Sequence, residues 1–343
     1  MNMLAFAINT AERAPLSDSL TLAGIDFLCA RTKRKLERAP REEEETFTQR
    51  MTDFPVATNT DDANRQHYEV PAEFFSLVLG QQRKYSCCYY PSATTTLDDA
   101  ETAALAETVK HASLRDGMDI LELGCGWGSL SLYMARQFPN ARITSVSNST
   151  SQRAYILGEA ERQGIHNLTV ITADMNDFAP SDTYDRIVSV EMFEHMSNWR
   201  TLFERTRGWL RDDGKLFIHV FTHKSRSYRF CPSDPADWIA QHFFTGGIMP
   251  AHDLPHRFED TYDVEEEWRW SGEHYRRTAM DWLANFDRQS DRITPILREV
   301  YGADAALWRR RWRLFFLATA GLFGHDGGSV WGVGHYLLTP AKR

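Results

Sequence analysis

The chain has 343 residues, of which 42% are hydrophobic, so it is long enough to bury a large core. Acidic side chains outnumber basic ones by 47 to 39, which gives a formal net charge of −8. This acidic balance argues against nucleic acid or an anionic membrane surface as the partner. No segment holds the roughly 18 uninterrupted apolar residues of a membrane span, so we expect no integral membrane contact. A globular enzyme fits these totals.

The five cysteines form no CxxC pair and have no nearby histidine at zinc-finger spacing, so we expect no metal ion and a reducing compartment. The first residues, MNMLAFAINTAERAPL, lack the basic start and the long apolar run of a signal peptide. Both observations favour a cytoplasmic location. The oligomeric state stays open, a homodimer included.

The first part of the chain, residues 1–75, is predicted to be helical and charged. Residues 30–45 read ARTKRKLERAPREEEE, which is more typical of a solvated helix or arm than of a partner-binding site. The aromatic-rich run that starts at Asn64, NRQHYEVPAEFFSLVLG, indicates ordered helical structure leading into the core.

Residues 76–225 alternate between strand and helix signals, which is the pattern of a parallel sheet with helices on both faces. The expected strands are Asp119–Leu123, Arg142–Ser147, Leu168–Thr172, Arg186–Val190 and Lys215–Val220. The expected helices are Ser129–Gln137, Ser151–Gln163 and Trp199–Leu210. We therefore predict an α/β fold with a doubly wound, Rossmann-like core.

The alternation stops after Ser225, and residues 226–300 are rich in Trp, Phe, His and Pro. Their place after the fifth strand predicts a helical cap inserted over the substrate. Residues 301–343 contain the helix-like run RRRWRLFFLATAGLFG and the glycine-containing run VWGVGHYLLTP. We expect these runs to supply a C-terminal helix and the closing antiparallel strands of the core.

The segment DILELGCGWGSL is a buried strand that runs into a loop with Gly124, Gly126 and Gly128. Glycine permits a positive φ there and lets the backbone approach a ligand closely. The spacing is GxGxG rather than the GxGxxG of dinucleotide sites, and Glu122 beside it disfavours a phosphate but suits an ammonium group. The loop therefore predicts S-adenosylmethionine, a nucleoside cofactor with an amino-acid end. The alternative is a tight strand-to-helix turn without a ligand.

Two neighbouring strand ends supply candidates for the rest of the cofactor site. Asp174 and Met175 follow the third strand, where an acidic and an apolar side chain could hold an adenine. The second strand ends VSNS, without the carboxylate that usually binds a ribose. We expect Asn148 or Gln152 to bind the ribose instead.

The fourth strand runs into EMFEHM, which should border the site because ligands bind beyond the carboxyl ends of such strands. If a helix begins near Glu191, then Glu191, Glu194 and His195 share one face. A carboxylate or imidazole there could take the proton of an amine that attacks a methyl group. The alternative is that these side chains cap a helix or bind loop backbone. His219, inside the fifth strand, is by itself more typical of a structural residue.

With these residues the chain resembles the cyclopropane fatty acid synthase family of S-adenosylmethionine-dependent methyltransferases, and most of all its coclaurine N-methyltransferase-like branch. The resemblance spans residues 64–339 and rests on QHYEVPAEFF, KYSCCYY, ELGCGWGSL, VSNSTSQ, VEMFEHMSNW, GKLFIHVFTHK, FFTGGIMP, SGEHYRRT and RWRLFF. It implies the class I methyltransferase fold. It also explains the second strand, because the family has Asn, Ser and Gln there in place of an acid.

The resemblance implies roles for individual residues. Tyr85 and Ser86 are expected to close over the cofactor. The residues expected to contact it are Gly124, Gly126, Asn148, Gln152, Asp174 and Met175. In the cyclopropane synthases a bicarbonate acts as base, and the positions that match its ligands are Cys87, Glu194, His219 and Tyr275. In the N-methyltransferase branch, the groups that deprotonate or position the amine match Glu191, Glu194 and His195.

Two functions follow, because the motifs do not choose between nitrogen and carbon methylation. The first is transfer of a methyl group to a small, partly apolar acceptor, above all an amine nitrogen, and the segment FFTGGIMP and the C-terminal run favour it. The alternative is a lipid-modifying enzyme, a cyclopropane fatty acid synthase or fatty acyl C-methyltransferase, that acts on an acyl chain with bound bicarbonate as base. A binding module that keeps the fold without turnover is a third hypothesis.

Overall fold

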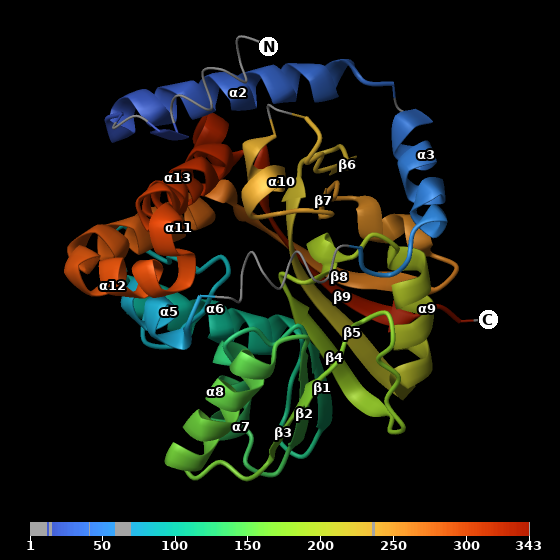
Figure 1. Cartoon of the computed structure of the whole chain (residues 1–343). Helices are drawn as coiled ribbons and strands as arrows, with labels where there is room; N and C mark the ends of the chain where they lie inside the picture. The colour runs from blue at the N-terminus through green and yellow to red at the C-terminus, as the bar shows by residue number, and fades with distance from the viewer. Residues whose placement is uncertain (1–11, 14–15, 41, 59–69, 235–236, 343) are drawn as a thin grey trace.

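A seven-stranded sheet forms the centre of the protein (Figure 1). A computed structural model describes residues 12–13, 16–40, 42–58, 70–234 and 237–342. The strand order is β3-β2-β1-β4-β5-β9-β8, with β1 (Asp119–Leu123), β2 (Arg142–Ser147), β3 (Leu168–Thr172), β4 (Tyr184–Val190), β5 (Leu210–His223), β8 (Tyr262–Ser271) and β9 (Trp331–Pro340). Strands β1 to β5 pair in parallel, and β9 runs antiparallel between β5 and β8. The predicted doubly wound α/β core is confirmed.

Helices cover both faces of the sheet (Figure 1), and successive residues of β1 pack against opposite faces. Ile120 of β1 lies in an apolar cluster with Leu130 of α7 (Ser129–Gln137). Its neighbour Leu121 lies in a second cluster with Phe203 of α9 (Trp199–Trp209). The remaining core helices are α6 (Leu97–His111) and α8 (Thr150–Arg162). A strand that is covered on both faces is apolar at consecutive positions, which makes it visible in the sequence.

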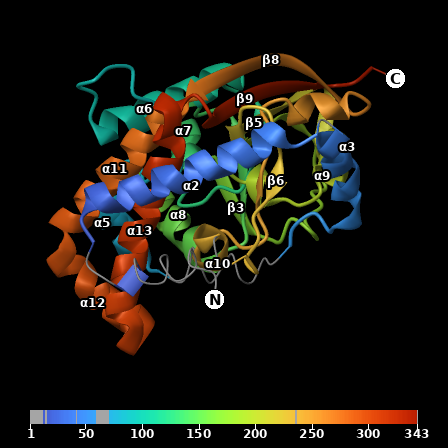
Figure 2. The ribbon, with the colours of Figure 1, turned by 90° about the horizontal axis from the view of Figure 1, so that it is seen from above.

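Helices from distant parts of the chain form a cap beside the sheet (Figures 1 and 2). They are α2 (Asp18–Arg38), α5 (Ala72–Val78), α10 (Trp238–His242), α11 (Gly272–Arg288), α12 (Ser290–Tyr301) and α13 (Ala305–Gly324). Short 3-10 turns are η1 (Met51–Asp53), η2 (Phe193–His195), η3 (Leu254–Phe258), η4 (Gly302–Asp304) and η5 (His325–Gly328). Helix α13 packs against α2, α11 and α12. The cap is therefore assembled from both ends of the chain.

The charged N-terminal region forms α2 and a second helix, α3 (Glu42–Arg50), in agreement with the predicted helical segment. One of its glutamates is not solvated. Glu44 is buried and accepts the backbone N–H of Ser227 at 2.8 Å. This contact fastens α3 to the segment that follows β5.

The expected helical cap at residues 226–300 also contains strands, which is a correction to the sequence analysis. They are β6 (Tyr228–Arg229), β7 (Ile248–Met249) and β8. Strand β8 joins the main sheet at its edge, so the closing antiparallel pair does not come from the C-terminal run alone. Its sequence, YDVEEEWRWS, carries three consecutive glutamates because much of this edge strand is exposed to solvent. Because of these charges, β8 cannot be recognised in the sequence as a run of apolar residues.

The length and apolar character of the helices decide whether any of them could span a membrane. Among the described residues, no helix is long and apolar enough to cross a bilayer. The cytoplasmic location and the homodimer stay predictions.

Gly272 opens α11, and a side chain there is expected to destabilise the fold. A β-carbon at this position would collide with the backbone carbonyl oxygens of Phe323 and Trp331. We expect Gly272→Ala to lower the free energy of unfolding by about 1–3 kcal/mol, measured by urea denaturation. The control is Gly158→Ala in α8, where no atom lies within 4 Å of the added β-carbon. That variant should gain up to about 1 kcal/mol, and equal stability of the two variants would contradict the analysis.

Candidate active site

A cavity opens beyond the carboxyl ends of β1 to β4, where the strand order reverses between β1 and β4. Six residues that the sequence assigned to the cofactor line this cavity, namely Gly124, Gly126, Asn148, Gln152, Asp174 and Met175. The structure thus brings these residues together. We refer to this space as the glycine cavity.

The glycine loop has the backbone geometry that the sequence predicts. Gly124 and Gly126 have φ values of 80° and 51°, in the left-handed region that favours glycine. A β-carbon on Gly124 would lie 2.7 Å from the side chain of Met192, whereas no atom of the described residues lies within 4 Å of one on Gly126. At Gly126 the loop therefore leaves room for a ligand against the backbone.

Gln152 provides a test of whether this cavity fits a nucleoside. Its side-chain oxygen accepts the hydroxyl of Ser147 at 2.6 Å, which fixes the orientation of the amide. Its Nε2 is buried and has no hydrogen-bond partner among the described residues. A buried donor without an acceptor costs about 1–3 kcal/mol. The amide therefore fits a ligand oxygen, such as a ribose hydroxyl, in the glycine cavity.

Glu122 lies beneath the loop rather than in the cavity lining. Its carboxylate accepts the hydroxyls of Ser131 and, at 2.7 Å, of Ser145. Burial raises the pKa of Glu122 to about 7. The side chain joins β1, β2 and α7, and its expected contact with an ammonium group stays a prediction.

A second cavity, here called the aromatic cavity, adjoins the first. Its polar lining consists of Glu191, Glu194, His195, Tyr85, Tyr275 and Thr319, and the remaining lining is apolar and largely aromatic: Phe221, Phe230, Ile239, Phe244, Met249, Trp282, Phe315, Leu322 and Phe323. Glu191 and His195 line both cavities, so they mark the place where a cofactor group can meet a second substrate. Tyr85, expected to close over the cofactor, lies on the aromatic side.

The segment after β4 differs from the helix expected to begin near Glu191. Glu191 has a φ of 47°, and only the 3-10 turn η2 follows. Its backbone N–H still pairs with the carbonyl of His219 at 2.8 Å, so sheet pairing continues through the residue. The predicted arrangement of Glu191, Glu194 and His195 on one helical face is therefore wrong, although all three reach the aromatic cavity. A left-handed conformation of a non-glycine residue persists only where its surroundings hold it.

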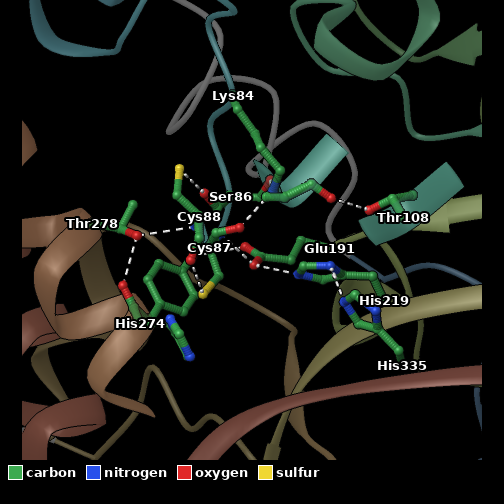
Figure 3. A network of polar contacts seen from close by, with 12 residues as sticks. Lys84, Ser86, Cys87, Cys88, Thr108, Glu191, His219, His274, Thr278 and His335 are labelled. Atoms are coloured by element: carbon green, nitrogen blue, oxygen red, sulfur yellow. Dashed lines mark hydrogen bonds and ion pairs between the residues drawn. The ribbon is translucent and has the colours of Figure 1, made fainter. Parts of the chain in front are cut away.

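The Glu191 carboxylate is held by three groups from distant parts of the chain (Figure 3). It accepts the backbone N–H of Cys87 at 2.8 Å and the hydroxyl of Tyr275 at 2.7 Å. Nε2 of His219 lies 3.2 Å from the same carboxylate. His219 is therefore part of the site and not merely a core residue of β5.

Lys84 is a buried cation that the sequence analysis missed. Its ammonium group donates to the hydroxyl of Ser86 and to the carbonyl of Cys87, both at 2.6 Å. Burial raises the pKa of Glu191, and the charge of Lys84 acts in the opposite direction. Ser86 accepts the hydrogen bond from Lys84, and its expected contact with the cofactor stays a prediction. In the sequence, the feature that could have pointed to Lys84 is its position at the start of the KYSCCYY motif.

The bicarbonate expected from the resemblance does not fit this arrangement. Three of its four expected ligands, Cys87, His219 and Tyr275, already bind the Glu191 carboxylate. A carboxylate and a bicarbonate present the same planar pair of oxygens, so both would use the same donors. Glu191 therefore occupies the place that the ligand set would offer to bicarbonate.

Glu194, the fourth expected ligand, is left without such donors. Both of its carboxylate oxygens are buried, and no described side chain donates a hydrogen bond to them; only the backbone N–H groups of Glu194 itself and of Phe221 lie close enough to lower its pKa. Burial raises the pKa of Glu194 well above its ordinary value, and the charge of Glu191 raises it further. A buried carboxylate in this state is unfavourable unless a ligand supplies a cation or a proton donor.

The fold and the glycine cavity define a class I methyltransferase, an enzyme that uses S-adenosylmethionine. Residues 57–331 match the sequence profile described as mycolic acid cyclopropane synthetase, and the chain belongs to that family. The resemblance seen in the motifs is thus confirmed.

Relatives within the family have two kinds of activity. The (S)-coclaurine N-methyltransferase of Thalictrum flavum subsp. glaucum is 36% identical over 297 residues, which cover 85% of this chain and 82% of the relative. The cyclopropane-fatty-acyl-phospholipid synthase of Escherichia coli K12 is 29% identical over 266 residues, 74% of this chain and 66% of the synthase. A solved coclaurine N-methyltransferase, bound to N-methylheliamine and S-adenosylhomocysteine, superposes with a TM-score of 0.93 at 32% identity, over 97% of this chain and 98% of that one.

Gly126 is expected to be indispensable for cofactor binding. A valine there would place its side chain in the glycine cavity and would strain the left-handed backbone, so Gly126→Val should abolish binding of S-adenosylhomocysteine in calorimetry. The control is Gly117→Val, because Gly117 has a φ of 85° and equally open surroundings but precedes β1. If both variants lose binding alike, backbone strain and not the cavity is the cause.

Glu194 is expected to reduce the stability of the ligand-free protein. Its pKa is raised in the folded state, so folding becomes less favourable as the pH rises above about 4.3, the ordinary glutamate pKa. Glu194→Gln should therefore be more stable than the wild type at pH 8, by about 1–3 kcal/mol, with a smaller difference at pH 5. Urea denaturation at both pH values measures this. The exposed Glu266→Gln is the control, and a Glu194→Gln variant that is less stable at pH 8 would contradict the assignment.

Proposed function

We propose that this methyltransferase transfers the methyl group of S-adenosylmethionine to the nitrogen of a small, partly apolar amine. The observation that carries this proposal is Glu194, a fully buried carboxylate to which no described side chain donates a hydrogen bond, in the wall of an aromatic cavity. An ammonium ion supplies the positive charge and the N–H donors that this carboxylate lacks. Aromatic rings around it add favourable contacts with a cation.

Three polar residues of the aromatic cavity, Glu191, Glu194 and His195, then take part in the reaction. When bound in the glycine cavity, S-adenosylmethionine supplies an electrophilic methyl group. Glu194 draws the ammonium form of the acceptor into the cavity, and Glu191 or His195 accepts its proton, because an amine attacks only when it is neutral. The ring of His195 lies 4.3 Å from that of Phe244, which limits its movement. The aromatic walls exclude water and hold the nitrogen in line with the methyl group.

The relatives support an amine as the acceptor. The similar protein of Thalictrum flavum is an N-methyltransferase, and the similar solved structure holds N-methylheliamine. The competing function, modification of an acyl chain with bicarbonate as base, has a relative in the Escherichia coli synthase. It is the weaker proposal because Glu191 uses the donors on which a bicarbonate would depend.

Methyl transfer from labelled S-adenosylmethionine to a panel of secondary amines and to phospholipid vesicles separates these two functions. We expect label in the amines, and label confined to acyl chains would overturn the proposal. Glu194→Gln and His195→Ala should lower kcat by about 10²–10⁴-fold, because a proton acceptor or its partner is lost. Their affinity for S-adenosylhomocysteine should stay near that of the wild type. Glu266→Gln is the matched control, and a Glu194→Gln variant that lost only cofactor affinity would show that Glu194 is misassigned.

A further inference from the structure

Three histidines form a continuous chain of contacts from Glu191 towards the surface. His219 of β5 contacts Glu191 through Nε2 at 3.2 Å and His335 of β9 through Nδ1 at 2.8 Å. Nδ1 of His335 then lies 2.8 Å from Nδ1 of His111, the last residue of α6. Nε2 of His111 lies 3.2 Å from the carboxylate of Glu107, whose side chain is 30% exposed. Figure 3 shows the inner part of this chain, from Glu191 through His219 to His335.

The positions of the rings are fixed by the fold. His219 and His335 face each other in the β5–β9 register, and both are fully buried. His111 stacks on Trp268 of β8 with 3.8 Å between ring centroids, and Trp270 packs against His335 at 4.2 Å. All six ring nitrogens are engaged, so each ring has one contact on the inner side and one on the outer side. Packing of the core does not by itself require polar contacts between three histidine rings.

A count of protons shows what the chain can do. Four contacts, from Glu191 to Glu107, need one proton each, whereas three neutral imidazoles carry three. The chain therefore has a place for one extra proton, which resides on the carboxyl group at one end or at the other. In the form that receives a proton, Nε2 of His219 carries none, and a shift of each proton across its own contact then moves the extra proton from Glu191 to Glu107. The three rings return to their starting tautomers, by rotation or by proton exchange, before the next turnover.

Burial and nearby charges favour the neutral form of the three rings, which the proton shift requires. Burial lowers the pKa of His219, His335 and His111. The buried charge of Lys84 lowers the pKa of the two inner histidines further. At the outer end, Lys110 opposes and Glu107 favours protonation of His111. With Glu191, these are the charged groups around the chain of rings.

We propose that His219, His335 and His111 conduct the proton released in methyl transfer from Glu191 to Glu107, and from there to water. The proposal rests on an amine acceptor. The N–H bond of the ammonium breaks and its proton goes to Glu191, while the electron pair left on nitrogen forms the new N–C bond. The C–S bond breaks and its pair stays on sulfur. One proton then enters the chain at His219 and another leaves from His111, so atoms and charge balance.

His335 and His111 line neither cavity, so they act only through Glu191. The path can be tested at its outer end, Glu107, because a substitution of this partly exposed residue leaves the buried core intact. Glu107→Gln keeps a hydrogen-bond partner for His111 but cannot take up a proton. The matched control is Glu266→Gln, because Glu266 is an exposed carboxylate of β8 that lies outside the chain of rings.

The test is kcat for a secondary amine as a function of pH. At neutral pH we expect Glu107→Gln and His335→Gln to lose at least about tenfold in kcat, with Glu266→Gln unchanged. The loss should shrink when the pH exceeds the pKa of the acceptor, since the amine then enters without its proton. A loss of the same size at every pH would show a structural defect and overturn the proposal.

A second measurement does not depend on turnover. The ring N–H protons shared between His219, His335 and His111 should give slowly exchanging proton NMR signals in the wild type that are lost in His335→Gln. If the wild type methylates amines and both variants match it at neutral pH, the proton path is wrong while the proposed function stands. If the wild type methylates no amine, the proposed function itself fails.

Discussion

The Glu191 carboxylate is the interaction on which the arrangement of the site depends. A buried carboxylate is unfavourable unless several polar groups satisfy it, and here its partners come from the segment before α6, from β5 and from α11. These contacts also hold a residue whose φ of 47° is unfavourable for a side chain other than glycine. The same contacts thus fasten the cap to the core at the edge shared by the two cavities.

The two carboxylates of the EMFEH segment have different surroundings and therefore different tasks. Glu191 is saturated with donors, so its position is fixed whether or not a ligand is present. Glu194, three residues later, has no side-chain donor among the described residues, and its buried oxygens face an aromatic cavity. The groups that the resemblance would assign to a bicarbonate here bind the side chain of Glu191. This exchange favours nitrogen as the methyl acceptor over an unsaturated acyl chain.

The sequence predicted the parts of the fold whose residues interact with near neighbours in the chain. The bounds of β1, β2 and β3 are those expected, because β1 is buried along its whole length and β2 and the edge strand β3 are rich in the β-branched residues Ile, Thr and Val. The glycine loop was visible for a similar reason, since a left-handed backbone at Gly124 and Gly126 selects glycine directly. Strand β8 was not visible, because its exposed edge accepts the glutamates that made it look like a loop or helix.

The sequence by itself determined the fold class, the cofactor loop and, through its motifs, the family. The tertiary structure alone decided which polar residues act together. Cys87 lies 104 residues from Glu191, and His111 lies 224 residues from His335, so no local pattern records either contact. Hydrogen bonds of this kind depend on the register of β5 with β9 and on the packing of α6 and α11 against the sheet. The roles of Lys84, His219 and His335 became apparent only when those elements were in place.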